Sequence, residues 1–141
     1  MKPTRTFRFA SLALAAGFAL GGSSATNAAD IAVKLTGDQE VPAVTSAASG
    51  VGTIVIKNDK SVSGSIKTSG LEGTMAHIHL GEPGKNGPPI ITLNKTENTW
   101  SVPAGSKLTD DQYKSFKEGN LYVNVHSAEH KGGEIRTQLK P

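Results

Sequence analysis

Short segments rich in Val, Ile and Thr recur along most of this 141-residue chain, separated by clusters of Gly, Pro, Asn, Asp and Ser. Runs of about four to eight such residues bounded by turn formers are typical of β-strands, and several at close spacing are typical of an all-β sandwich. The sequence therefore predicts an antiparallel β-sandwich. We expect its strands over 31–36, 50–57, 62–68, 74–80, 89–93, 100–102, 121–127 and 133–139.

One segment near the C-terminal end has the pattern of a helix instead. Thr109 and Gln112 have the spacing of a capping box, in which each side chain bonds the backbone of the other residue. Two aspartates lie between them, where the positive end of the helix dipole favours acidic side chains. Gly119 fits the position after the last helical turn. We expect one short connecting helix near 109–118.

The start of the chain has the three parts of a secretory signal peptide. Three basic residues and no acidic one come first, the run 9–20 is apolar, and small residues follow. The apolar run is shorter than the roughly 20 residues that span a bilayer. We expect a signal peptide over 1–28, cleaved after Ala28 or Ala29, and one domain over 29–141. The protein is then periplasmic or secreted, with no membrane span after cleavage.

The charge of the expected domain is balanced. The chain has 15 Lys+Arg and 12 Asp+Glu, and three of the basic residues lie in the leader, so the domain has twelve of each sign. Zero net charge and few aromatic residues argue against a nucleic-acid partner. The chain has no cysteine, which excludes disulfides, thiol catalysis and thiolate metal sites.

All four histidines lie in or beside two of the expected strands. Because alternate side chains share a face of a strand, Met75, His77 and His79 lie opposite the apolar side chains of their strand. His126 occupies the polar face of the second strand, and His130 follows just beyond it. Imidazole suits copper and zinc, and a thioether suits copper. The candidate metal ligands are therefore His77, His79 and His126, joined by His130 and Met75.

The same residues also fit a structural role. If the last two strands pair around their turn, His126 lies opposite Glu134 and Asn124 lies opposite Arg136. Such cross-strand pairs tie the polar face of a sheet together. Glu134 and Arg136 equally fit as the hydrogen-bond partners that orient metal-bound imidazoles. The sequence favours the structural interpretation and keeps a copper or zinc site as its alternative.

No motif in the chain indicates an enzyme. Serines are plentiful, but none lies in the Gly-x-Ser-x-Gly turn of a hydrolase nucleophile. The glycine-rich segment Gly81–Pro88 is not followed by a helix start, as a phosphate-binding loop requires. We therefore expect a non-enzymatic protein.

Six motifs follow one another along the chain: Leu35–Pro42, Gly50–Thr53, Ala76–Gly81, Gly84–Pro88, Leu121–His126 and Gly133–Leu139. Together they resemble the CHRD domain, which is named for chordin and also occurs in exported bacterial proteins. The resemblance implies an immunoglobulin-like Greek-key β-sandwich acting as a binding or structural module of the cell envelope. It supplies no catalytic residues and leaves the partner, a protein or a metal ion, unidentified.

Overall fold

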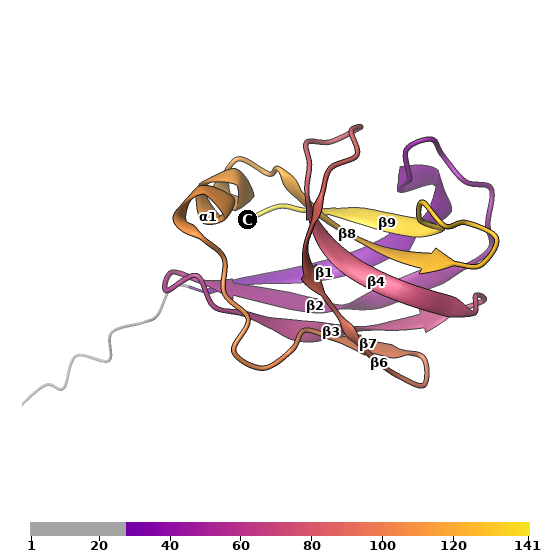
Figure 1. The fold of residues 1–141 in the computed structure, drawn as a ribbon, viewed down its shortest axis with the longest axis horizontal. Coiled ribbons are helices and arrows are strands. Elements are labelled where there is room, and N and C mark those ends of the chain that lie inside the picture. The colour runs from indigo at the N-terminus through magenta and orange to yellow at the C-terminus, as the bar shows by residue number, and fades with distance from the viewer. Residues whose placement is uncertain (1–27) are drawn as a thin grey trace, which may run out of the picture.

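A computed structural model of the protein describes residues 28–141, so the predicted signal peptide lies, apart from Ala28, outside the described residues. The described chain is almost entirely β-structure with one short helix, α1 (Asp110–Lys117) (Figure 1). Its strands are β1 (Ala28–Thr36), β2 (Ser49–Lys57), β3 (Val62–Ser69), β4 (Gly73–Leu80), β5 (Pro89–Thr92), β6 (Asn94–Thr96), β7 (Thr99–Ser101), β8 (Leu121–Ser127) and β9 (Ile135–Leu139).

These strands form one antiparallel sheet in the order β5-β4-β8-β9-β1-β2-β3-β7-β6. The sheet curls, so that β4, β8 and β9 form one side of the molecule and β1, β2 and β3 the other (Figure 1). The two sides join through β9 and β1, whose pairing includes Thr36 and Arg136. The predicted all-β fold is confirmed, and the two layers expected of a sandwich are two halves of a single curled sheet.

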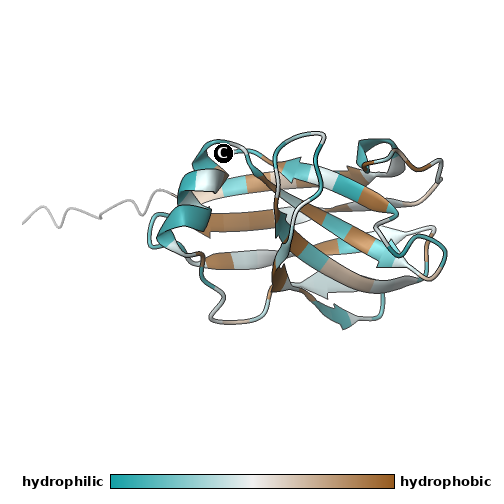
Figure 2. Cartoon of the chain, turned by 45° about the horizontal axis from the view of Figure 1, so that its top comes forward, coloured by the Kyte–Doolittle hydropathy of each residue, from teal (hydrophilic) through white to brown (hydrophobic). Residues whose placement is uncertain are grey.

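The space between the two sides holds the apolar core. Hydrophobic and hydrophilic residues alternate along most strands (Figure 2), as expected where one face of a sheet is buried. Full burial of each large aliphatic side chain stabilises the fold by about 1.5–3 kcal/mol. The completely buried apolar side chains come from both halves of the sheet: Leu35, Ile54, Ile66, Ala76, Ile78, Leu121, Val123, Val125, Ile135 and Leu139.

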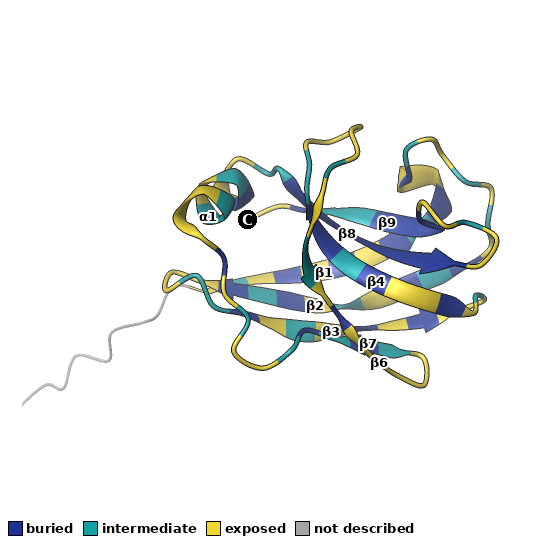
Figure 3. Cartoon of the chain, in the orientation of Figure 1, coloured by how far each residue is buried: buried dark blue, intermediate teal, exposed yellow. Residues whose placement is uncertain are grey.

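Strand β8 departs from this alternation, because every one of its residues is buried (Figure 3). Its second face is polar and is covered by loops. Arg136 anchors the cover, since its guanidinium donates to the carbonyl oxygen of Lys85 at 2.8 Å and to Asn86 Oδ1 at 3.2 Å. Asn86 Nδ2 in turn donates to the carbonyl oxygen of Val41 at 2.6 Å.

Helix α1 begins with the predicted capping box. The Gln112 amide N–H donates to Thr109 Oγ1 at 3.2 Å, and the Thr109 N–H donates to Gln112 Oε1 at 2.9 Å. Gly119 follows the helix with a φ of 79°, a conformation that glycine adopts without strain. Among the residues that the structure describes, no helix combines the length and apolarity needed to cross a membrane.

Several elements differ from the sequence prediction. The polar strand β6 and a short 3-10 turn at Gly37–Gln39 were not expected. The last strand begins at Ile135 rather than at residue 133, because Gly133 has a φ of 125° and belongs to the turn.

Candidate metal centre

Three of the four histidines meet on the covered polar face of β4 and β8. His77 and His79 alternate along β4, and His126 lies on the neighbouring strand β8, opposite Met75. His77 lies opposite Asn124, two residues before His126, so the two imidazoles are diagonal neighbours. Adjacent antiparallel strands therefore bring all three rings to one place, which alternation alone did not establish.

The distances among these imidazoles suit a single metal ion. One nitrogen from each ring can be chosen so that all three lie within 4.8 Å of one another. His77 Nδ1 and His126 Nε2 are 3.1 Å apart. Because Zn–N bonds are about 2.0–2.1 Å long, two nitrogens bound to one ion lie roughly 3–3.4 Å apart. The ring centroid of His77 is 5.4 Å from that of His79 and 5.0 Å from that of His126.

Backbone carbonyls fix the orientation of two of the rings. His79 Nδ1 lies 2.9 Å from the carbonyl oxygen of Gly87, and His126 Nδ1 lies 2.8 Å from that of Lys131. A carbonyl oxygen only accepts, so both Nδ1 atoms carry the hydrogen and both Nε2 atoms present a lone pair. His77 Nδ1 must then donate to His126 Nε2. A metal ion bound here would displace that hydrogen.

One buried nitrogen of the cluster lacks a well-formed hydrogen bond. His79 is only 7% exposed, and its Nε2 has no partner of normal hydrogen-bond geometry within residues 28–141, although burial lowers the pKa of His79 and the Asn124 side chain lies near enough to oppose this effect. A buried polar atom without a partner costs about 1–3 kcal/mol. Metal-bound histidines typically combine a free nitrogen facing the ion with a second nitrogen that donates to an oxygen. His79 has this arrangement.

The environment also keeps two of the imidazoles neutral. Burial lowers the pKa of His77, and the neighbouring His126 and His79 lower it further. Burial is likewise the main cause that lowers the pKa of His79, against an opposing effect of its hydrogen bond to Gly87. Only the neutral imidazole offers a lone pair to a metal ion.

A stack of three side chains holds His79 in place. The Tyr122 ring lies parallel to the His79 ring, at 3° and with centroids 4.6 Å apart. The Arg136 guanidinium covers the other side of Tyr122, 3.5 Å from the ring centroid. Tyr122 Oη also accepts from the Gly87 N–H at 3.1 Å. Tyr122 and Gly87 were not among the predicted site residues, although Tyr122 alternates with Asn124 and His126 on the same face of β8.

The other predicted site residues lie around this cluster with different contacts. Met75 is on the histidine face of β4 and is 50% exposed. His130 lies in the turn after β8, where its N–H donates to Ser127 Oγ, and it is not one of the three converging histidines.

Glu134 does not make the expected pair with His126. Its carboxylate accepts from Ser46 Oγ at 2.7 Å, while its N–H continues the ladder to the Val125 carbonyl. The Lys131 carbonyl orients His126 instead. Asn124 and Arg136 are opposite each other as expected, but the guanidinium bonds the covering loop.

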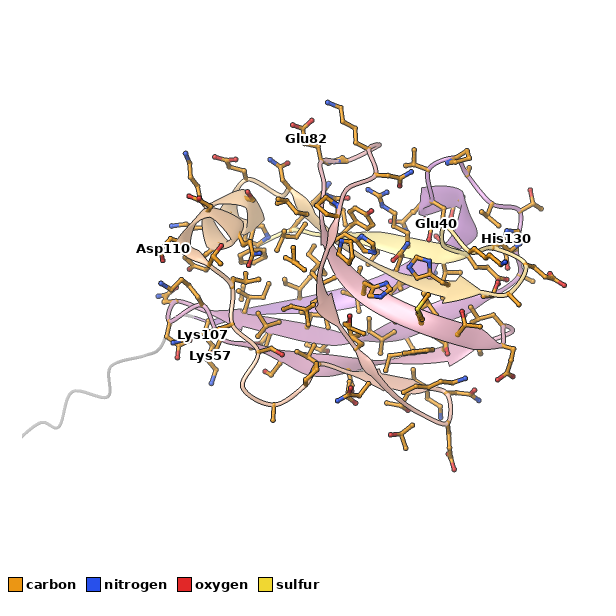
Figure 4. The ribbon with its side chains drawn as sticks, viewed as in Figure 1. Glu40, Lys57, Glu82, Lys107, Asp110 and His130 are labelled. Atoms are coloured by element: carbon orange, nitrogen blue, oxygen red, sulfur yellow. The ribbon has the colours of Figure 1, made fainter. Side chains whose placement is uncertain are left out.

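A buried carboxyl group lies behind the cluster. Glu40 is 5% exposed, and burial raises its pKa to about 7, against the opposing effects of Asn124 and Arg136. Glu40 Oε1 and Asn124 Oδ1 are both buried and without hydrogen bonds within the described chain. Figure 4 shows Glu40 at the same end of the molecule as His130, beside β8 and β9. No sequence pattern had singled out Glu40.

Comparison with known proteins identifies the domain. The family model of the CHRD domain matches residues 31–139, nearly all of the chain that the structure describes. Searches of curated proteins and of solved structures gave no match. The family match supports a small β-domain with a binding or structural role, in agreement with the curled sheet. The chain belongs to the CHRD domain family.

Proposed function

We propose that this CHRD domain is an exported metal-binding module that holds one copper or zinc ion between His77, His79 and His126. The observation that carries this proposal is the buried, unpartnered Nε2 of His79, which lies beside two other imidazole nitrogens. The predicted signal peptide supports a periplasmic or secreted location.

Metal binding accounts for more of the cluster than a purely structural role does. A structural role favours a hydrogen-bond partner for each buried nitrogen, and it was expected to include a His126–Glu134 pair. Glu134 instead bonds Ser46, and His79 Nε2 has no partner among the described residues. An ion at the centre of the cluster would bind that nitrogen and would replace the His77–His126 hydrogen bond with two coordinate bonds.

Three imidazoles suit Zn²⁺ and copper, and they leave one coordination position open. His77 is only partly buried, so an ion reaches the cluster from the side of this residue. No nucleophile with an adjacent base and orienting acid is evident from the sequence. We therefore propose a carrier or storage protein rather than an enzyme.

Calorimetric titration of the purified protein with Zn²⁺ and, separately, Cu²⁺ tests this function. We expect saturable binding of one ion per chain, abolished in the double variant His77→Ala/His79→Ala. The matched control is His130→Ala, which removes the histidine outside the cluster and should bind as the wild type does. Absence of saturable binding, or equal loss in the control, contradicts the proposal. Circular dichroism confirms that each variant is folded.

A further inference from the structure

Met75 occupies the rim of the histidine cluster, where its exposure needs an explanation. It precedes His77 by two residues on β4, so both side chains lie on the same face. It also lies directly opposite His126 on β8. Met75 and Val51 are the two large apolar side chains most exposed to solvent in the described chain, and Val51 lies on β2 in the other half of the sheet.

The position of Met75 puts its sulfur within reach of an ion in the cluster. Directly opposed residues of antiparallel strands have Cβ atoms about 4.5–5.5 Å apart. The methionine side chain is unbranched and flexible, so its thioether adapts to an irregular site. His126 presents its Nε2 to the same place. Rotation about the flexible Met75 side chain can therefore bring the sulfur toward the cluster.

A thioether changes which metal such a site prefers. Thioether sulfur is a soft ligand that selects Cu⁺, whereas three imidazoles alone also suit Zn²⁺ and Cu²⁺. We propose that Met75 is the fourth ligand and makes this a site for cuprous copper. This inference rests on the proposed function, and it names the ion that the three histidines hold.

The composition of the chain makes the proposal sharply testable. The sequence has no cysteine and two methionines, of which the other is Met1 at the start of the predicted leader. A sulfur atom bound to copper must therefore come from one of these two residues. Replacing Met75 by Leu keeps an apolar side chain of similar size while removing the sulfur.

The first experiment compares metal affinities in the full-length protein. Cu⁺ affinity is measured by competition with a colorimetric Cu⁺ chelator, and Zn²⁺ and Cu²⁺ affinities by calorimetry. In Met75→Leu we expect Cu⁺ affinity to fall by about tenfold or more, with divalent affinities changed by less than about twofold. The control Val51→Leu should leave all three affinities unchanged. Equal Cu⁺ affinities of wild type and Met75→Leu overturn the inference.

The second experiment is X-ray absorption spectroscopy of the Cu⁺-loaded protein. We expect a copper–sulfur distance in the wild type that disappears in Met75→Leu. A spectrum with nitrogen ligands alone in the wild type, or a sulfur signal that persists in the variant, contradicts the inference. If the titrations show metal binding, these two spectroscopic results contradict only the role of Met75 and not the three-histidine site. Failure of every ion to bind wild type contradicts the proposed function itself.

Discussion

Replacing Glu40 by Gln should change how the stability of this protein depends on pH. Glu40 is 5% exposed, and burial raises the pKa of its carboxyl group from 4.5 to about 7. The folded state therefore binds a proton that the unfolded state releases between these two values. Stability from this group is fully present below pH 4.5 and is lost as pH rises through about 7.

The magnitude follows from the two pKa values. Each pKa unit corresponds to about 1.4 kcal/mol, so ionised Glu40 lowers the free energy of unfolding by about 3 kcal/mol at pH 8 relative to pH 4. Gln has nearly the same shape and stays neutral at every pH in this range. Glu40→Gln should therefore be more stable than wild type by up to about 3 kcal/mol at pH 8, with little difference at pH 4.

Urea denaturation of the metal-free protein measures this difference, with the buried single tryptophan, Trp100, as the fluorescent probe. Taking the difference between variant and wild type removes the contributions of titrating groups that do not interact with Glu40; His130, which does interact with it, is the exception. The control Glu129→Gln changes an exposed carboxylate nearby and should show no such trend. A difference between Glu40→Gln and wild type that stays constant from pH 4 to pH 8 refutes the reasoning.

Further variants probe the residues around the cluster and the cap of helix α1. Tyr122→Leu removes the ring stacked on His79 and should lower Zn²⁺ affinity by about tenfold, since the residues that hold a metal ligand typically contribute that much. Tyr122→Phe keeps the stacked ring and should lower the affinity less. Equal Zn²⁺ affinities of wild type and both variants in calorimetry contradict the role of the stack. Gly87→Ala places a Cβ 1.7 Å from the Leu80 carbonyl oxygen and should destabilise the protein by about 2 kcal/mol or more. An unchanged melting temperature contradicts this close approach. Thr109→Ala removes the helix cap and should reduce the free energy of unfolding by about 1 kcal/mol, with no effect on metal affinity; unchanged urea denaturation argues against the cap.

Much of the fold could be predicted from the sequence because strands, turns and helix caps each have characteristic residues within a few positions of one another. The capping box of Thr109 and Gln112 and most strand positions were found in the structure. Strand β6 was missed because its three residues are all exposed and show no hydrophobic pattern. The 3-10 turn at Gly37–Gln39 has no distinctive sequence pattern either.

The candidate site was less predictable because long-range contacts build it. Alternation placed His77, His79 and His126 on polar faces, but only the pairing of β4 with β8 brings them together. The burial of His79 depends on the covering loop. Arg136 holds this loop through hydrogen bonds to Lys85 and Asn86, which lie 50 residues or more before it in the sequence. The burial of Glu40 arises in the same way. The predicted side-chain pair of His126 with Glu134 was wrong. Strand register alone does not determine which of several neighbours a side chain bonds, and the Glu134 carboxylate accepts a hydrogen bond from Ser46 instead.

Anomalous X-ray diffraction from crystals soaked with Zn²⁺, and separately with copper, tests the three-histidine centre most directly. We predict one strong peak about 2.0–2.1 Å from His77 Nδ1, His79 Nε2 and His126 Nε2, with the Gly87 and Lys131 carbonyls still accepting from the imidazoles. Data collected on either side of the metal absorption edge identify the ion. A map with no peak among these three nitrogens contradicts the account, as does a peak bound elsewhere in the protein.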